Sequence, residues 1–260
     1  MEGFIQLTLV DVAIAAAFVV LVAVLSLVNR LGVEKTLAVG AVRTFVQLLA
    51  VGYALKWVFG LDRWYLVLLA VVLMVGVAGW HGARRAGPGG RVVVIATAAI
   101  FLSSVAVILF LFGAVIRVEP WYDPRYVIPL AGMVINTAMN GASLGMATFA
   151  TSARDHAERL EAALAAGASS AAAARPYVRD AVKKALIPTL NALMTVGIVQ
   201  LPGAMTGMIL AGSPPTAAVL YQIVIMYMIA AAAALSAIGA VMWYSRSFFT
   251  PAHQLRPEQT

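Results

Sequence analysis

The residues best placed to do chemistry in this chain are polar side chains inside long apolar runs. Arg43 and Gln47 lie one helical turn apart, and Met133, Asn136 and Asn140 repeat that spacing in a later run. At about 100° per residue, each set falls on one face of a helix. Polar groups at membrane depth are costly unless they face a partner helix or a water-filled path. The two faces therefore predict either a path for a polar solute or hydrogen bonds between helices.

Composition places both faces in an integral membrane protein. Of the 260 residues, 62% are hydrophobic and 11% are charged, and the mean hydropathy is +0.93. Soluble domains carry roughly 25% charged residues. We therefore expect an all-α integral membrane protein that forms a single transmembrane domain over residues 1–260.

Seven apolar runs predict about seven transmembrane helices, because each run is near the roughly 20 residues that cross a bilayer. Backbone groups in lipid must be paired internally, and a helix pairs them within one segment. Pro202 and Gly203 are expected to break the sixth run, either at a site that exposes backbone groups to a solute or at a loop on the outer membrane edge. The runs are 12–28, 37–59, 64–80, 92–116, 127–150, 186–211 and 217–243.

The distribution of basic residues orients these helices. The formal net charge is +7, and most Lys and Arg residues fall on one side if the N-terminus is outside and the C-terminus is cytoplasmic. They are spread over several short loops, which is typical of contact with membrane lipid and of topology control rather than of nucleic-acid binding. The absence of cysteine excludes disulfides, thiolate zinc sites and cysteine nucleophiles.

One long polar segment, residues 152–185, separates the fifth and sixth runs on the predicted cytoplasmic side. Residues 153–174 are rich in strong helix formers. Glu161, Ala162 and Ala163 are followed by Gly167, which predicts a small helical surface beside a charge and ahead of a turn. Two interpretations remain open: a surface gripped by a partner in the cytoplasm, and a solvated extension of the fifth helix.

Glycine spacing predicts close packing of helices. Gly141 and Gly145 form one GxxxG pair, and Gly203 and Gly207 form another. Such pairs let two backbones approach closely. We expect both pairs to pack against helices within one subunit or between subunits.

Several stretches resemble a known family of permeases. The Glu-Ala-Ala then Gly spacing is similar to the coupling loop of ATP-binding-cassette importer permeases. RTFVQLLAVGYAL from Arg43, PLAGMVINTAMNGASLG from Pro129, and the run from Ile187 through Asn191 and Pro202 resemble the iron-export permease family (FetB-like). That family also includes the plant aluminium-tolerance membrane subunits. The resemblance covers most of the chain.

The resemblance implies a permease subunit in the cell inner or plasma membrane that exports iron or another metal. It implies a homodimer bound to two separate ATPase subunits, which bind ATP and Mg, whereas this chain has no P-loop and no cofactor of its own. The metal ligands stay unknown, since neither cysteine nor an intramembrane histidine is present. The candidate pathway residues are Arg43, Gln47, Met133, Asn136, Asn140, Asn191 and Pro202, and the candidate ATPase-coupling residues are Glu161, Ala162, Ala163 and Gly167.

Two other functions have specific sequence requirements. A secondary transporter driven by an ion gradient usually needs intramembrane carboxylates, and Asp11, at a helix end, is the one candidate. An intramembrane serine hydrolase would use Ser143, which lies in a G-x-S-x-G pattern. That chemistry needs a strand-to-helix elbow and a histidine base, and the histidines fall in predicted loops or in the tail.

Overall fold

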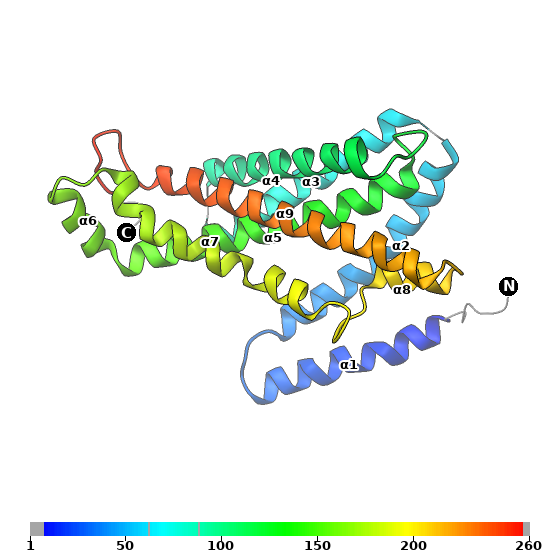
Figure 1. The fold of residues 1–260 in the computed structure, drawn as a ribbon. Coiled ribbons are helices and arrows are strands. Elements are labelled where there is room, and N and C mark those ends of the chain that lie inside the picture. Colours follow the sequence, from blue (N-terminus) through cyan, green and yellow to red (C-terminus); the bar gives the residue numbers. More distant parts are fainter. Residues whose placement is uncertain (1–7, 62, 88, 257–260) are drawn as a thin grey trace. The chain divides into compact units, whose positions relative to one another are not determined.

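The computed structural model describes residues 8–61, 63–87 and 89–256, and in these ranges the chain is built from helices (Figure 1). It divides into two compact units, Met1–Arg63 and Trp64–Thr260, each of which is described by itself. The first unit holds α1 (Leu9–Val28) and α2 (Glu34–Leu61). The second holds α3 (Trp64–Ala86), α4 (Gly90–Phe110), the π-helix η1 (Leu111–Val115), α5 (Pro124–Asp155), α6 (Ala157–Ala165), α7 (Ser170–Thr195), α8 (Gly203–Leu210) and α9 (Pro215–Ser247).

The first unit is a helical hairpin held by polar contacts at its turn. Ser26 Oγ donates a hydrogen bond of 2.8 Å to Glu34 Oε2, and it accepts one of 3.2 Å from the Val33 backbone N–H. At the other end of α1, the Thr8 N–H donates to Asp11 Oδ2 at 2.7 Å, which with the reciprocal bond to Thr8 Oγ1 completes a capping box. Asp11 therefore has a structural role as a helix cap.

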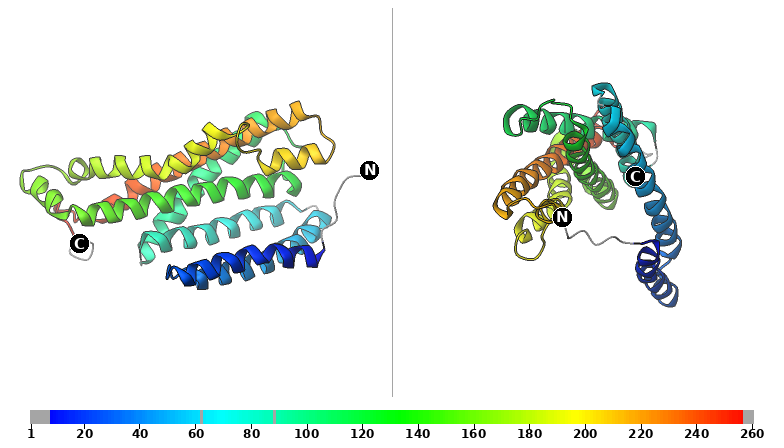
Figure 2. Two further views of the ribbon diagram at one scale, coloured as in Figure 1. Left: turned by 90° about the horizontal axis from the view of Figure 1, so that it is seen from below. Right: turned by 90° about the vertical axis from the view of Figure 1, so that its right-hand side faces the viewer.

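In the second unit, α5 is the central helix, and α9 lies along it with α3, α4 and α7 packed around the pair. The apolar side chains of these helices form one buried core. Figures 1 and 2 show α6 at one end of this unit and α8 with the start of α9 at the other. The long helices therefore connect a terminal helix, α6, to the region around α8.

The Gly141 and Gly145 pair packs α5 directly against α9. A Cβ atom at Gly141 would lie 2.6 Å from the Ala233 carbonyl oxygen, and one at Gly145 would lie 2.7 Å from Val241 Cγ2. Real Cβ atoms do not approach so closely: at Gly141 the obstacle is backbone, so the two helices would have to separate, and at Gly145 the Val241 side chain would have to shift. The expectation of close packing is confirmed for this pair.

Gly203 and Gly207 behave differently. A Cβ atom at either position would meet nothing within 4 Å among the described residues. The described residues therefore show no close helix packing at this pair within one subunit. Packing of the pair between subunits stays a prediction.

An aromatic cluster fixes the end of α5 that leads to α6. The rings of Phe149 and Phe248 lie 5.1 Å apart edge to face, as do those of Tyr244 and Phe248. The Tyr244 hydroxyl donates to the Ala86 carbonyl oxygen at 3.2 Å, which joins the end of α3 to the cluster. The base from which α6 projects is thus held by buried contacts among α3, α5 and α9.

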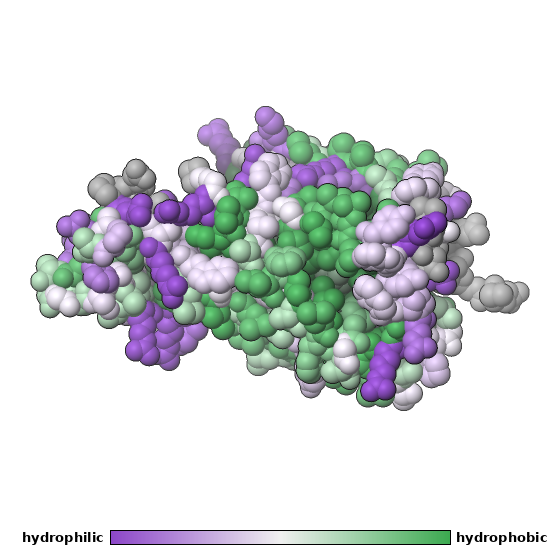
Figure 3. Space-filling view, turned by 90° about the horizontal axis from the view of Figure 1, so that it is seen from above, coloured by the Kyte–Doolittle hydropathy of each residue, from purple (hydrophilic) through white to green (hydrophobic). Residues whose placement is uncertain are grey.

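Within the described ranges, six helices are long and apolar enough to cross a membrane, so the chain is a multi-pass membrane protein. Apolar side chains cover much of the middle of the face in Figure 3, and hydrophilic ones gather toward its ends. The predicted sixth span is divided between the end of α7, a break, and α8, so the count of seven spans stays a prediction. The six spans are Leu9–Val28, Glu34–Val58, Trp64–Ala86, Gly90–Val115, Pro124–Asp155 and Pro215–Ser247.

The polar segment 152–185 is helical over most of its length. It comprises the end of α5, the short helix α6 and the first half of α7. The interpretation as an extension of the fifth helix is therefore correct for residues 152–155. Beyond them the chain makes a separate helix, and the coupling role of that helix stays a prediction.

Candidate functional site

A cavity of about 250 Å³ lies among α5, α9 and the segment that joins α7 to α8. Asparagine, threonine and glutamine side chains supply its polar groups, and methionine, isoleucine, valine, alanine and proline supply the rest. No ionisable side chain lines it among the described residues. The lining residues are Met133, Asn136, Thr137, Ala192, Val196, Gln200, Pro202, Gly203, Ala204, Gln222, Ile225, Met226 and Ile229.

The break between α7 and α8 forms one wall of this cavity. α7 ends where Val196 adopts an extended conformation, and Gly197 then takes a φ of +84°, which favours glycine. The Gly197 N–H donates to the Gln200 carbonyl oxygen at 2.9 Å, and Pro202 precedes the first residue of α8. The predicted break near Pro202 is confirmed, although it begins earlier, at Val196.

The structure brings three of the predicted pathway residues together. Met133 and Asn136, one turn apart on α5, line the cavity opposite Pro202 and the α7–α8 segment. Asn140 follows one turn later on α5 and is exposed, outside the lining. Asn191 is also exposed, on the last turns of α7, where its carbonyl oxygen accepts a hydrogen bond of 2.9 Å from Thr195 Oγ1.

The other two predicted pathway residues belong to the first unit. Arg43 and Gln47 lie on one face of α2, as their spacing predicts. They line a shallow pocket of about 500 Å³ whose other walls are alanine and valine. Their shared face is thus observed, and their role in a pathway stays a prediction.

Sequence reasoning missed the polar residue that is most deeply buried in the cavity wall. Gln222 is 5% exposed and lies in the apolar run of α9. A single amide in such a run is a detectable signal, but it has no polar neighbour one helical turn away that would mark a face. Thr137 and Gln200 were also missed.

The second candidate site is the surface of α6. Leu160 is 1% exposed and anchors the helix to the core, whereas Glu161 and Ala162 are exposed. Ala163 is half-buried and packs against the core. Glu161 and Ala162 therefore form the exposed part of the predicted small surface. Ala163 lies on the side of α6 that packs against the core.

Gly167 ends α6 in the way the sequence predicts. Its φ is +90°, its N–H donates to the Leu164 carbonyl oxygen at 2.9 Å, and the Ala168 N–H donates to the Ala163 carbonyl oxygen at 3.0 Å. This pair of bonds is a Schellman motif, in which glycine takes the left-handed position. Gly167 is therefore a conformational requirement of the α6–α7 turn.

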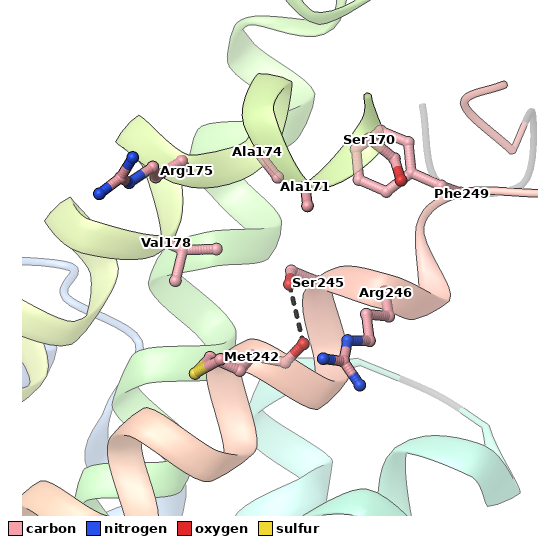
Figure 4. A pocket seen from close by; sticks show the side chains of 9 residues that line it. All are labelled: Ser170, Ala171, Ala174, Arg175, Val178, Met242, Ser245, Arg246 and Phe249. Atoms are coloured by element: carbon pink, nitrogen blue, oxygen red, sulfur yellow. Dashed lines mark hydrogen bonds between the residues drawn. The ribbon is translucent and has the colours of Figure 1, made fainter. Parts of the chain in front are cut away.

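A pocket of about 420 Å³ opens near α6, between the first turns of α7 and the end of α9 (Figure 4). Arg175 on α7 and Arg246 on α9 contribute exposed guanidinium groups to it, and Phe249 and Met242 contribute apolar walls. The Ser245 hydroxyl donates to the Met242 carbonyl oxygen at 3.0 Å. The helical end that carries α6 is thus basic on its α7–α9 side.

The alternative hydrolase site lacks the element that its chemistry requires. Ser143 is 1% exposed and lies in the middle of α5, packed among helices. A nucleophile elbow places the serine on a strand-to-helix turn, whereas the chain around Ser143 is continuous helix. No group of three or more His, Asp or Glu side chains that could hold a metal ion occurs in the part of the chain that is described.

Comparison with known proteins shows the family to which the chain is related. Residues 9–249 match the profile of UPF0014, an uncharacterised protein family. The UPF0014 membrane protein slr1647 of Synechocystis sp. is 36% identical over 215 residues, 82% of this chain and 83% of that protein. Protein ALUMINUM SENSITIVE 3 of Arabidopsis thaliana is 35% identical over 248 residues, 95% and 90% of the two chains.

A third relative carries a functional name. The "Probable iron export permease protein FetB" of Escherichia coli is 32% identical over 247 residues, which are 94% of this chain and 93% of the relative. The matches extend over both units and over the sites described above. No solved structure matched the chain.

Proposed function

We propose, because this chain belongs to the UPF0014 family of membrane proteins, that it is the membrane-spanning permease subunit of an ATP-binding-cassette exporter. Its cargo is iron or another metal, as the name of the Escherichia coli relative suggests. Two copies of the chain work with two separate ATPase subunits, which bind ATP and Mg. The N-terminus lies outside and the C-terminus lies in the cytoplasm.

The observation that carries this proposal is α6. It is a separate helix of 9 residues at the end of α5 and α7, anchored by Leu160 and closed by Gly167. It exposes Glu161 and Ala162 on its outer side. A partner that moves α6 moves the ends of two long helices, and α5 lines the cavity. An ATPase bound there can therefore transmit its closure to the cavity.

Exposed amides on the membrane helices support a dimer. Asn136, Asn140 and Asn191 are exposed in the single chain. In lipid, each amide would lose its hydrogen bonds with water, so such groups face protein or a water-filled path. A second copy of the permease would provide protein contact for these amides, and a hydrated route between or within the two permeases would provide the water-filled path.

The alternative of a gradient-driven carrier is weaker on this structure. Its one candidate coupling carboxylate, Asp11, accepts hydrogen bonds from Thr8 in a helix cap. A proton-coupling carboxylate must instead titrate and change partners during transport. The proposal therefore assigns the driving energy to ATP.

Purification of the tagged full-length chain from its native cells tests the proposal. We expect a separate polypeptide with a Walker ATPase motif to be recovered with it in equal amount, and the complex to hydrolyse Mg-ATP. Recovery of the chain without an ATPase, under detergent conditions that keep the permease folded, would contradict the proposal.

A further inference from the structure

The wall of the cavity among α5, α9 and the α7–α8 segment contains an amide oxygen without a hydrogen-bond partner. The Gln222 side chain is 5% exposed, and its Oε1 has no hydrogen-bond partner among the described residues. The same side chain lines the cavity. Buried polar groups are almost always hydrogen-bonded because loss of water without a replacement is costly. A ligand held in the cavity that this residue lines can supply the missing partner for the oxygen.

The position of Gln222 along α9 separates it from the aqueous ends of the helix. It lies seven residues after Pro215, the first residue of α9, which is roughly 10 Å at 1.5 Å per residue. Asn136 lies twelve residues after Pro124, the start of α5, or roughly 18 Å along that helix. The amides therefore stand within the membrane-spanning parts of their helices, where a solute must leave bulk water.

The other groups of the cavity are neutral oxygen and sulfur donors. Met133 on α5 and Met226 on α9 bring thioethers to the lining, and Asn136 brings a second amide. The Thr137 hydroxyl donates to the Met133 carbonyl oxygen at 2.7 Å, so its oxygen keeps lone pairs for a ligand. Thioethers prefer soft or borderline metal ions, whereas Mg²⁺ and Ca²⁺ prefer oxygen ligands and carboxylates.

We propose that Gln222, together with Asn136, Met133 and Met226, forms a binding site for a divalent transition-metal ion in transit. The inference rests on the proposed function, because it names the residues that hold the cargo of that transporter. A set of neutral donors binds a cation more weakly than a set with carboxylates. Weak binding suits a transport site, which must release its ion as well as capture it.

Binding of Co²⁺ to the full-length chain in lipid nanodiscs tests this site without ATP. We expect calorimetry to show Co²⁺ binding to the wild type and at least a tenfold loss of affinity in Gln222→Leu. Met226→Leu should weaken Co²⁺ binding several-fold, since it removes a thioether and keeps the volume. Met228→Leu is the matched control, because Met228 lies two residues further along α9, outside the lining, and should bind Co²⁺ as the wild type does.

A charged variant keeps the test decisive if Gln222→Leu fails to fold. Gln222→Glu nearly preserves the shape and adds a carboxylate, so it should bind Co²⁺ more tightly and also bind Mg²⁺, which the wild type should not. Wild-type Co²⁺ affinity in either Gln222 variant that folds would overturn the proposal, as would a wild type that binds no Co²⁺. Neither result would affect the recovery of an ATPase with the chain, so failure of this site is distinguishable from failure of the proposed function.

Discussion

Exchanging Glu161 for lysine is expected to lower the recovery of the ATPase with the permease by about ten- to a hundredfold. The carboxylate is exposed on α6 and free to accept a charge-assisted hydrogen bond from a partner. Such a bond contributes about 1.5–3 kcal/mol, and each 1.4 kcal/mol is roughly tenfold in affinity. Lysine removes the bond and repels a basic donor. Co-purification of the ATPase with each tagged variant measures the effect.

Three further variants separate docking from folding. Glu161→Gln keeps a hydrogen-bond acceptor and should lose less ATPase than Glu161→Lys. Ala162→Trp adds bulk to the exposed face and should also block docking. Glu119→Lys makes the same charge change in the exposed connection before α5, at the opposite end of that helix, and should leave recovery unchanged.

The structure decides which positions of α6 make a fair test. Ala163 is half-buried against the core, and Gly167 takes a φ of +90°. Large residues at either position would disturb the fold as well as any docking, so Ala162 is the better probe. Wild-type recovery of the ATPase in all α6 variants would place the docking surface elsewhere, and the exposed Arg84 and Arg85 in the last helical turn of α3 would be the next residues to change.

Replacing Asn140 with leucine is expected to leave the permease–ATPase complex assembled and to lower substrate-stimulated ATP hydrolysis several-fold. Asn140 is exposed one turn beyond the cavity residue Asn136, on the same face of α5. On a hydrated route between two permeases, leucine replaces a polar surface with an apolar one of similar size. ATP turnover of the purified complex, with and without metal, measures the change.

A neighbouring leucine provides the control for Asn140→Leu. Leu144 lies one turn further along the same face and is 39% exposed, and Leu144→Ala should keep both assembly and stimulation. Loss of the assembled complex in Asn140→Leu would instead identify the amide as a contact that holds helices together. Unchanged stimulation would remove Asn140 from the pathway.

The fold could be predicted from the sequence where the signal was local. Uninterrupted apolar runs located the long helices, because a helix pairs its backbone groups within one segment inside lipid. Gly167 was recognised as a turn and Gly141 with Gly145 as a packing site, since in both cases the requirement for glycine is local in sequence or repeats at helical spacing. Pro202 located the break in the sixth run because the effect of proline on a helix is also local in sequence.

Features that depend on packing between distant segments were less accessible. The break begins at Val196 and Gly197 because the chain turns back on Thr195, whose carbonyl oxygen accepts from the Val199 N–H at 3.0 Å. The burial of Gln222 in the cavity wall results from the packing of α9 against α5, which the spacing of residues in the sequence does not reveal. The packing of Gly203 and Gly207 was expected from spacing, yet a Cβ atom at either position would meet no other helix of the described residues within 4 Å.

ATP-driven metal movement by the reconstituted complex tests the central claim most directly. The purified permease and its ATPase would be placed in sealed vesicles, with ATP and Mg supplied on the side that α6 faces. We predict that Co²⁺ or Fe²⁺ crosses the membrane only when ATP is hydrolysed, and that Glu161→Lys abolishes this movement. Metal movement that continues without ATP, driven by an ion gradient, would contradict the account.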